Sequence, residues 1–533
     1  MCGGGFAIKK SYHFCLLKDF QKPIKAQSPY AQLCAATTLT KLISKPSSTL
    51  PIKERIEIKN YVLQYLYDRQ LEPFVSKALI QLYAKITKLG WLDSLDSQWV
   101  FRNVMDEIEK FLGQDITKCI IGVDLLRLLI VEVDKVGYAD NARPLTKQRK
   151  TAGSFRDTTL LDSFKTSIRL LRAALKAQDN FNVSDQRQLK LVSSLLELSY
   201  AALTFDFIGT CQDESSDDQT TVQIPTGWRS LFLSSTKDAN DSVLNLFFDL
   251  YKVLPADFCQ RVLSCLVQMA SIRRSLFSNE ERQQFLASLV RGICLILKNG
   301  SNLSNLKVYH EFCRLLGRLK ANYQLGELTS LDEYSEAIRL IAEFTVQSLK
   351  CFQFSPNSLH YLLGLWQRLT ASIPYIRNAR AHELEKYTPS VIKAYVESRL
   401  QCAKSVLFEG MDNPLDDQNS LIQQMDQIST ISRCEYEETT KTLSDFFDQT
   451  SQLYGQAIQG QLSEQDKRIV EFQLAWLVYI IGAAIGGRVS INSSDEQDAL
   501  DGNLIIKGSC SILSIVTRCF GMFSKVLLRL TPI

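Results

Sequence analysis

The feature that most constrains the fold is a helical hydrophobic period that recurs along nearly the whole sequence. Val75, Leu79, Leu82, Ile86 and Leu89 follow one another at intervals of 4, 3, 4 and 3 residues, which places them on one stripe of a helix. Few runs alternate between apolar and polar residues as strands do, so we expect no sheet. Similar helical stretches are predicted at 53–66, 100–112, 119–136, 160–175, 187–205, 243–252, 259–274, 280–298, 307–320, 335–350, 357–371, 390–408, 420–457 and 466–485.

Helix boundaries can also be predicted. Ser278 with Glu281 is a capping box, and Asn299-Gly300 is suited to a left-handed helix stop. Ser355 and Thr388 each precede a proline, the pattern of an N-cap followed by proline at the first helical position. Connections between the helices are mostly short, as antiparallel helix pairs require. Units of about 40–47 residues would give about 11–13 repeats. We therefore expect an all-α solenoid of stacked helix pairs.

Composition excludes several classes of protein. The 61 basic and 57 acidic residues leave a net charge of only +4, so we expect no nucleic-acid partner. Cys265, Cys294 and Cys313 lie among apolar residues at helical spacing, which is typical of reduced, buried thiols in a cytosolic or nuclear protein. No signal peptide opens the sequence. Residues 474–485 are apolar but too few to span a bilayer, so we expect a buried core helix and no membrane insertion.

The sequence carries no complete motif for catalysis or for cofactor binding. The sequence has four histidines, and His310-Glu311 lacks the second histidine that a zinc protease motif requires. Gly482, Gly486 and Gly487 lack the lysine and hydroxyl of a phosphate-binding loop, and close helix packing explains them more simply. A nucleophile elbow is also missing. We therefore expect neither an enzyme nor a cofactor or metal site.

Three polar segments interrupt the helical pattern. Residues 138–157 are basic, with Lys147, Arg149 and Lys150 clustered, and a solvated loop is favoured there over a localisation signal. Residues 411–419 form an acidic turn. Residues 210–225 form an acidic loop, for which a flexible linker is the simpler interpretation. Its alternative is a negative arm that contacts a basic patch on a partner. The candidate contact residues are Asp213, Glu214, Asp217 and Asp218.

Several stretches are more specific than a general helical pattern. Examples are ALIQLYA, YHEFCRLL, NYQLGEL and WLVYIIG. Together with their neighbours they make the sequence resemble the exportin-7 family of nuclear transport receptors, the Ran-binding protein 16/17 type of the karyopherin-β superfamily. The resemblance covers about residues 29–502. The stretches that carry it are 78–84, 89–91, 205–210, 213–218, 222–226, 228–230, 309–316, 322–328 and 476–482.

The resemblance implies a superhelix of HEAT-like helix pairs, of the karyopherin-β/armadillo type. It also implies a receptor that binds Ran in its GTP form, a protein cargo and nuclear pore proteins, and that shuttles between nucleus and cytoplasm. Residues 31–43 resemble part of the importin-β amino-terminal region, whose inner helices contact Ran. The residues that the resemblance proposes for this contact, expected at exposed positions, are Gln32, Lys41, Gln81, Lys85 and Lys88.

The resemblance also suggests a division of the chain. Residues 1–28 diverge from the family, 29–137 resemble the importin-β amino-terminal repeats, 138–502 are HEAT-like repeats that include the acidic loop, and 503–533 are a divergent tail. The sequence therefore looks truncated at both ends. Two alternatives stay open at this point, a non-catalytic helical scaffold that works without Ran and an inactive truncated isoform. The cargo and the direction of transport stay open as well.

Overall fold

The computed structural model describes residues 28–44, 50–113, 115–136, 144–176, 185–208, 221–233, 241–300, 302–376 and 382–486. Helices make up most of these residues, and the β-structure among them consists of two isolated bridges, Leu95–Gln98 and Val222–Ile272. The all-α prediction is confirmed. The chain divides into two compact units, Met1–Ser278 and Asn279–Ile533, and each is described by itself.

The first unit is a stack of helices in two layers. In one layer α2 packs on α4, α4 on α6, α6 on α9 and α9 on α12, so every link joins helices that are not consecutive in the chain. Helices α3, α8 and α11 pack across onto α4, α9 and α12. The helices are α2 (Pro29–Ser44), α3 (Ile52–Asp68), α4 (Pro73–Gly90), α5 (Val104–Glu109), α6 (Ile116–Asp134), α7 (Leu145–Phe155), α8 (Leu161–Lys176), α9 (Gln186–Leu203), α10 (Arg229–Phe232), α11 (Val243–Val253) and α12 (Ala256–Ala270).

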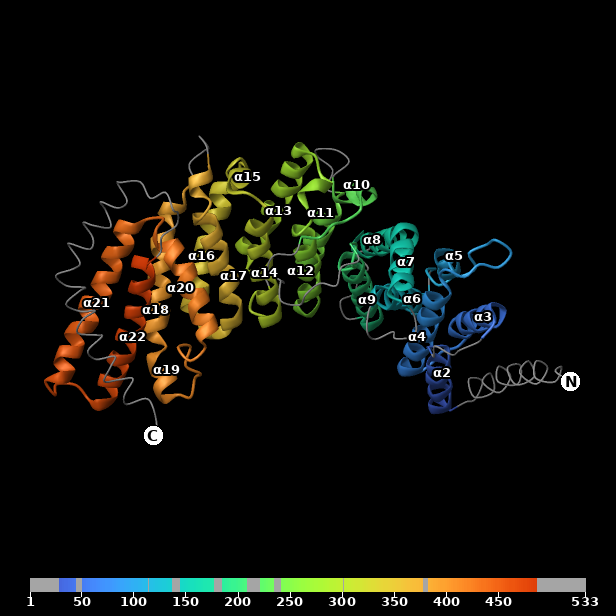
Figure 1. Ribbon diagram of the computed structural model, residues 1–533, viewed down its shortest axis with the longest axis horizontal. Helices are drawn as coiled ribbons and strands as arrows, with labels where there is room; N and C mark the ends of the chain where they lie inside the picture. Colours follow the sequence, from blue (N-terminus) through green and yellow to red (C-terminus); the bar gives the residue numbers. More distant parts are fainter. Residues whose placement is uncertain are drawn as a thin grey trace. The chain divides into compact units, whose positions relative to one another are not determined.

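The second unit repeats this arrangement. Helices α13, α16 and α18 pack in sequence to form one layer, and α14, α17, α20 and α22 form the other (Figure 1). This stacking of helix pairs confirms the predicted solenoid within each unit. The helices are α13 (Asn279–Asn299), α14 (Leu306–Asn322), α15 (Leu325–Thr329), α16 (Tyr334–Lys350), α17 (Leu359–Thr370), α18 (Thr388–Gln401), α19 (Ala403–Phe408), α20 (Gln418–Ser432), α21 (Tyr436–Ile458) and α22 (Glu464–Gly486).

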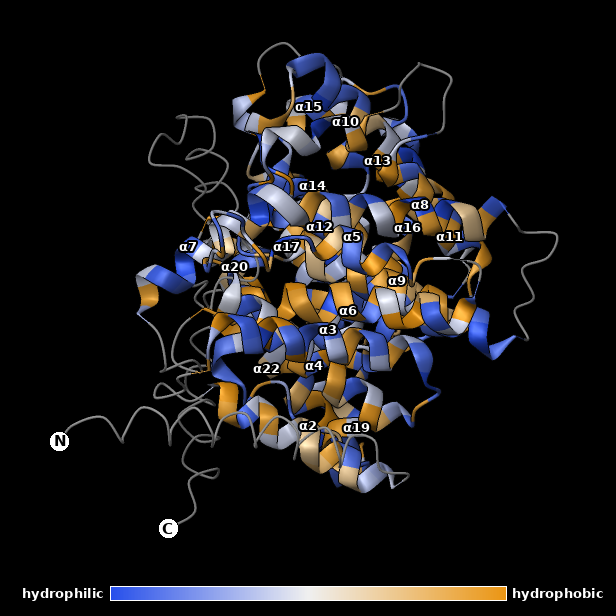
Figure 2. Ribbon diagram, turned by 90° about the vertical axis from the view of Figure 1, so that its right-hand side faces the viewer, coloured by the Kyte–Doolittle hydropathy of each residue, from blue (hydrophilic) through white to orange (hydrophobic). Residues whose placement is uncertain are grey.

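The apolar stripes of the helices form the core, and most helices carry both hydrophobic and hydrophilic residues (Figure 2). All five residues of the predicted stripe on α4 are buried. Gly90 at the end of α4 leaves room for a neighbouring ring, because a Cβ there would lie 2.5 Å from Cδ2 of Phe101. The thiols of Cys265, Cys294 and Cys313 are buried, as the sequence predicts.

One predicted boundary is confirmed, one is wrong, and one holds only for a short 3-10 turn. Gly300 has a φ of +59° and its N–H donates to the carbonyl of Ile296 at 2.9 Å, so α13 ends in the predicted left-handed cap. Thr388 is not an N-cap, because Tyr387 occupies that position and Thr388 is buried as the first residue of α18. Ser355 precedes a short 3-10 turn, and α17 begins only at Leu359.

Two long predicted helices are in fact pairs. The stretch 390–408 divides into α18 and α19 at Cys402, and the stretch 420–457 divides into α20 and α21 at residues 433–435.

The basic segment is also different from expectation, because residues 145–155 form α7 and not a solvated loop. Gln148, Thr151 and Phe155 lie on a buried face of this helix, at spacings of three and four residues.

Helix α22 is only partly buried, although the sequence predicts a buried core helix there. Trp476, Leu477 and Ile480 are buried, and the helix packs against α18, α20 and α21. Only 33% of its most apolar window is buried, however, so one face stays exposed. Among the described residues, α22 is the one helix long and apolar enough to cross a membrane, judged by length and composition alone.

Candidate partner-binding surface

The residues predicted to contact a partner lie on the first two helices of one layer, α2 and α4, which pack against each other. Lys41 is exposed in the last turn of α2, and Gln81 is exposed near the middle of α4. Helix α6 packs on the other side of α4 and continues the same layer. The layer therefore offers these two side chains to solvent from neighbouring helices.

Lys85 and Lys88 are held by the next helix of the layer. The Lys85 ammonium lies 2.9 Å from Oε1 of Glu132 on α6. The Lys88 ammonium donates to the carbonyl of Lys135 at 2.7 Å, just beyond the end of α6, where the helix dipole favours a cation. Lys85 is half-buried and Lys88 is only 4% exposed. The expectation that Lys88 is exposed is therefore wrong, because it fastens α4 to α6.

Gln32 is also turned inward. Its side chain is 8% exposed, and its amide donates to the hydroxyl of Tyr65 on α3 at 3.1 Å. In contrast, the sequence did not single out Tyr30 and Phe74, which are 77% and 40% exposed, with ring centroids 5.9 Å apart. Each follows the proline that begins its helix and lies off the apolar stripe, and this is the signal that could have identified them. We call the set of Tyr30, Lys41, Phe74 and Gln81, which are exposed, and Lys85, which is half-buried, the α2–α4 surface.

A buried carboxyl group joins α6 to the segment that precedes the acidic loop. Asp134, the last residue of α6, accepts a hydrogen bond from the backbone N–H of Asp206 at 2.8 Å. Burial raises the pKa of the Asp134 carboxyl from 3.8 to about 6, and the charge of Asp206 adds to this effect. The hydrogen bond from Asp206 and the nearby ammonium of Lys88 act in the opposite direction on this pKa.

This raised pKa predicts how Asp134 affects stability. The Asp134 carboxyl group binds its proton more tightly in the folded state than in the unfolded chain. Protonation of Asp134 therefore stabilises the folded state fully below pH 3.8, and this stabilisation is lost as the pH rises through 6. Asp134→Asn keeps the acceptor oxygen without the charge, and we expect it to stabilise the protein by about 1–3 kcal/mol at pH 7.5. Urea unfolding at pH 4–8 would measure this. The gain should vanish near pH 4, and a gain independent of pH would contradict the assignment. Asp162→Asn, at an exposed site, should have no effect.

The acidic residues Asp213, Glu214, Asp217 and Asp218 lie outside the described residues. The segments that flank them are firmly packed in the first unit. The ring of Phe207 contacts that of Trp228 edge-on at 5.6 Å, and Trp228 stacks on Phe164 at 4.9 Å. Val222 exchanges backbone hydrogen bonds with Ser271 and Arg273 at 2.9 and 3.0 Å. Phe207 before the acidic loop and Trp228 after it therefore belong to the same aromatic cluster.

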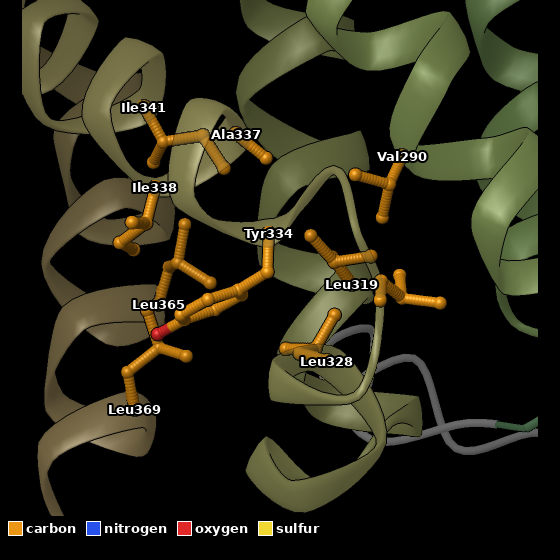
Figure 3. Close-up of a pocket in the computed structure, with 10 residues that line it drawn as sticks. Val290, Leu319, Leu328, Tyr334, Ala337, Ile338, Ile341, Leu365 and Leu369 are labelled. Atoms are coloured by element: carbon orange, nitrogen blue, oxygen red, sulfur yellow. The ribbon is translucent and has the colours of Figure 1, made fainter. Parts of the chain in front are cut away.

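The second unit contains a histidine–serine pair between helices and a small cavity. His310 shares a hydrogen bond of 2.9 Å with Ser358, whose side chain is fully buried, so this pair joins α14 to the turn before α17. A small cavity of about 20 Å³ lies between α13, α14, α16 and α17 (Figure 3). Its lining is apolar except for the hydroxyl of Tyr334, which donates to the carbonyl of His382 at 2.5 Å. Within the described residues, no cluster of His, Cys, Asp and Glu has the geometry of a metal site.

Comparison with known proteins gives a consistent family. Residues 402–516 match the family model described as the exportin-7-like TPR domain. The chain is 52% identical to Exportin-7-B of Xenopus laevis over 504 residues, which is 94% of this chain and 45% of that protein. It is 48% identical to Ran-binding protein 16 of Drosophila melanogaster, over 91% of this chain and 43% of that one. It is 46% identical to human Ran-binding protein 17, over 94% of this chain and 45% of that protein.

A solved structure of a Kap121p mutant matches 92% of this chain and 53% of the mutant's own chain, at 11% sequence identity. The TM-score of this match is 0.24, which is too low to bear on the fold. The present chain spans less than half the length of the curated relatives named above. Over that span the identity to these relatives is 46–52%. The chain belongs to the exportin-7 family.

Proposed function

We propose that this protein is a nuclear transport receptor that binds Ran in its GTP form and a protein cargo. The observation that supports it most is the 52% identity, over 94% of this chain, to a protein named an exportin. Relatives named for Ran binding, at 46–48% identity, support the choice of Ran as partner. In this proposal the α2–α4 surface contacts Ran, and Lys88 and Gln32 hold its helices in place from inside.

The mechanism that we propose requires no catalytic residue. Each helix of a two-layer stack contacts mainly its neighbours, so small rotations between repeats add up to a change in curvature. Ran and cargo that both favour one curvature would each raise the affinity for the other, because linkage between two binding sites is reciprocal. Contacts with nuclear pore proteins, and shuttling between nucleus and cytoplasm, belong to the same proposal.

The acidic loop would add a second contact. We infer that Asp213, Glu214, Asp217 and Asp218 meet a basic patch on a partner, since the segments on either side of them are fixed in the first unit. Charged contacts at the edge of an interface mainly change the association rate and its dependence on salt. Replacing the four residues by Asn or Gln should therefore slow association at low salt more than at high salt.

Binding to Ran tests the α2–α4 surface directly. We expect the chain to bind Ran loaded with GTP and not Ran loaded with GDP, as measured by biolayer interferometry. Lys41→Glu and Gln81→Glu change exposed positions only, and each should weaken binding by about 5–30-fold, or about 1–2 kcal/mol. Lys350→Glu on α16, also exposed, is the matched control and should bind as the wild type does. If the chain bound both nucleotide forms of Ran equally, or bound neither form, the alternative of a helical scaffold that works without Ran would be favoured.

A further inference from the structure

Helix α7 presents three basic side chains that form no ion pair with a carboxylate of the described residues. Arg149 and Lys150 are exposed and Lys147 is half-buried, while another face of the helix is buried in the first unit. The sequence of α7 contains neither Asp nor Glu. Just after the helix, by contrast, Arg156 forms an ion pair with Asp157 at 2.7 Å. The basic segment therefore folds into a helix that gathers unpaired positive charge.

A buried tryptophan joins this basic helix to a fourth cation. Lys147, Lys150 and Ser154 follow at intervals of 3 and 4 residues, so they share one side of α7. The hydroxyl of Ser154 accepts a hydrogen bond from Nε1 of Trp91 at 3.1 Å. Arg102, which precedes α5, donates from Nε to the carbonyl of Trp91 at 3.1 Å, and its Cζ lies 5.8 Å from the centroid of the Trp91 ring. Trp91 therefore connects the basic side of α7 with Arg102.

Arg102 lies over an exposed aromatic ring. Its Cζ is 3.9 Å from the ring centroid of Trp99, which is 46% exposed. Burial lowers the pKa of the Arg102 guanidinium, as expected for a cation without a nearby carboxylate. A guanidinium that is stacked on a ring keeps its plane fixed, and its two Nη groups can then donate to both oxygens of one carboxylate. Arg102 and Trp99 thus form a platform suited to an acidic group.

A tight turn positions Trp99 on this platform. Asp96 and Ser97 have φ values of +50° and +64°, and Leu95 and Gln98 on either side of them exchange backbone hydrogen bonds at 3.0 and 2.9 Å. Two consecutive left-handed residues are the geometry of a type I′ turn, in which Asn-Gly is preferred. Strain of this kind is concentrated at binding sites. Because the loop is held in shape before a partner arrives, little conformational entropy is lost on binding.

From these observations we propose that this part of the first unit binds an acidic segment of a partner protein. Four cations without paired carboxylates favour an anionic partner, and Trp and Arg are the residues that contribute most at protein interfaces. A protein is favoured over a nucleic acid, because the net charge of the chain is only +4 and nucleic-acid binding depends on many phosphate contacts. The α7–Trp99 surface consists of Trp99, Arg102, Lys147, Arg149 and Lys150.

The α7–Trp99 surface shares no residue with the α2–α4 surface, so the inference does not depend on Ran binding. In the complex, carboxylates of the acidic segment pair with the basic side chains of α7 and with the Nη groups of Arg102. The ring of Trp99 packs against the same segment. Charged contacts of this kind weaken as salt is added, so binding is strongest at low ionic strength.

Tryptophan fluorescence tests the proposal in the unmodified chain. Trp99 is the exposed one of the five tryptophans, and the other four are fully buried. Acrylamide should therefore quench mainly Trp99. A glutamate-rich peptide of about 12 residues, which spans up to ~40 Å when extended, should lower the quenching constant at least about twofold at low salt. The same peptide with Gln in place of Glu should give no protection. Equal protection by both peptides, or by neither, would overturn the proposal.

Charge reversal on α7 identifies the site. Arg149→Glu combined with Lys150→Glu changes exposed positions only, and it should weaken binding of the fluorescein-labelled glutamate peptide at least about tenfold, measured by fluorescence anisotropy. The matched control is Arg187→Glu combined with Lys190→Glu on α9. Both of these residues are exposed and the net charge changes by the same amount, so we expect less than about a twofold effect. Equal losses in the two double variants would show a general charge effect and contradict the proposal.

Two further measurements complete the test. Trp99→Ala should weaken binding of the glutamate peptide at least about threefold while the circular dichroism spectrum stays unchanged, because the side chain is exposed in the free protein. Unchanged affinity in this variant would remove Trp99 from the surface and refute its part of the proposal. A single-stranded RNA with the same number of charges should bind more weakly than the peptide. Tighter binding of the RNA would show a nucleic-acid site instead.

Discussion

Replacing Glu107 by Leu is expected to lower the free energy of unfolding by about 3–5 kcal/mol, although Glu107 is one of many acidic residues near a helix surface. The reason is its partner. Lys59 on α3 is 1% exposed, and its ammonium makes an ion pair with Oε1 of Glu107 on α5 and donates to the carbonyl of Val100 at 3.3 Å. The other carboxylate oxygen accepts a hydrogen bond from the hydroxyl of Tyr83 on α4 at 3.1 Å. Without Glu107, a buried cation has no counter-charge.

Two further variants isolate this cause. Asp106→Leu removes a neighbouring carboxylate that is exposed, and we expect a change within about 0.5 kcal/mol. Lys59→Met combined with Glu107→Leu removes both charges and should recover most of the loss, because an apolar pair of similar volume can replace a buried ion pair. Urea unfolding followed by circular dichroism measures all three. If the double variant were less stable than Glu107→Leu alone, the buried charge would not be the cause.

The helices were predictable because the apolar stripe is a local pattern. Val75 to Leu89 on α4 show this, since each residue is buried where the period places it. The repeat length was predictable only in part, because α2, α4 and α6 begin 44 and 43 residues apart, as expected, whereas α6, α9 and α12 begin 70 residues apart. Lys59 pairs with Glu107 at a separation of 48 residues, Lys85 with Glu132 at 47, and Tyr334 donates to His382 at 48. Contacts at these separations join one helix pair of the stack to the next.

The partners of individual charged side chains were not predictable. Lys59 and Lys88 look like solvent-facing lysines, because the sequence does not show which carboxylate or carbonyl lies one repeat away. The same reason explains why Lys88 was wrongly expected at the surface. Gln81, which precedes Leu82 and lies on another face of α4 from the apolar stripe, is exposed as expected. Helix α7 was missed because its apolar residues are few, and of its two large ones, Leu145 and Phe155, only Phe155 is buried. Burial of Gln148 and Thr151 depends on neighbours from other repeats.

Arg282→Met should destabilise the second unit by about 3–5 kcal/mol. Arg282 on α13 is 3% exposed and donates to Oε1 of Glu327 and to the carbonyl of Asn322, both at 2.6 Å. Its guanidinium lies over the ring of Tyr323, 4.3 Å from the centroid. Glu327 in turn accepts the backbone N–H of Gln324 at 2.8 Å, which caps the short helix α15. One arginine thus fastens α15 and the end of α14 to α13.

The matched control lies on the same helix. Arg291 also makes an ion pair, with Glu333 at 3.3 Å, but its side chain is 59% exposed. Arg291→Met should therefore cost no more than about 1 kcal/mol, the usual limit for a surface ion pair. Arg282→Lys keeps the charge without the planar fork, so an intermediate loss of about 1–3 kcal/mol is expected. Urea unfolding gives the free energies, and equal losses at 282 and 291 would contradict the assigned role of burial.

Hydrogen exchange gives an independent measurement of what Arg282 holds. Leu328 of α15 and Leu331, which follows α15, line the apolar cavity of the second unit together with residues of α16 and α17. Figure 3 shows Leu328 among these residues. In Arg282→Met, the amides of residues 325–331 should exchange at least tenfold faster, since a helix of five residues has little stability of its own. The amides in the middle of α14 should keep their protection under native conditions. If exchange rose equally in both segments, Arg282 would stabilise the whole unit and not α15 in particular.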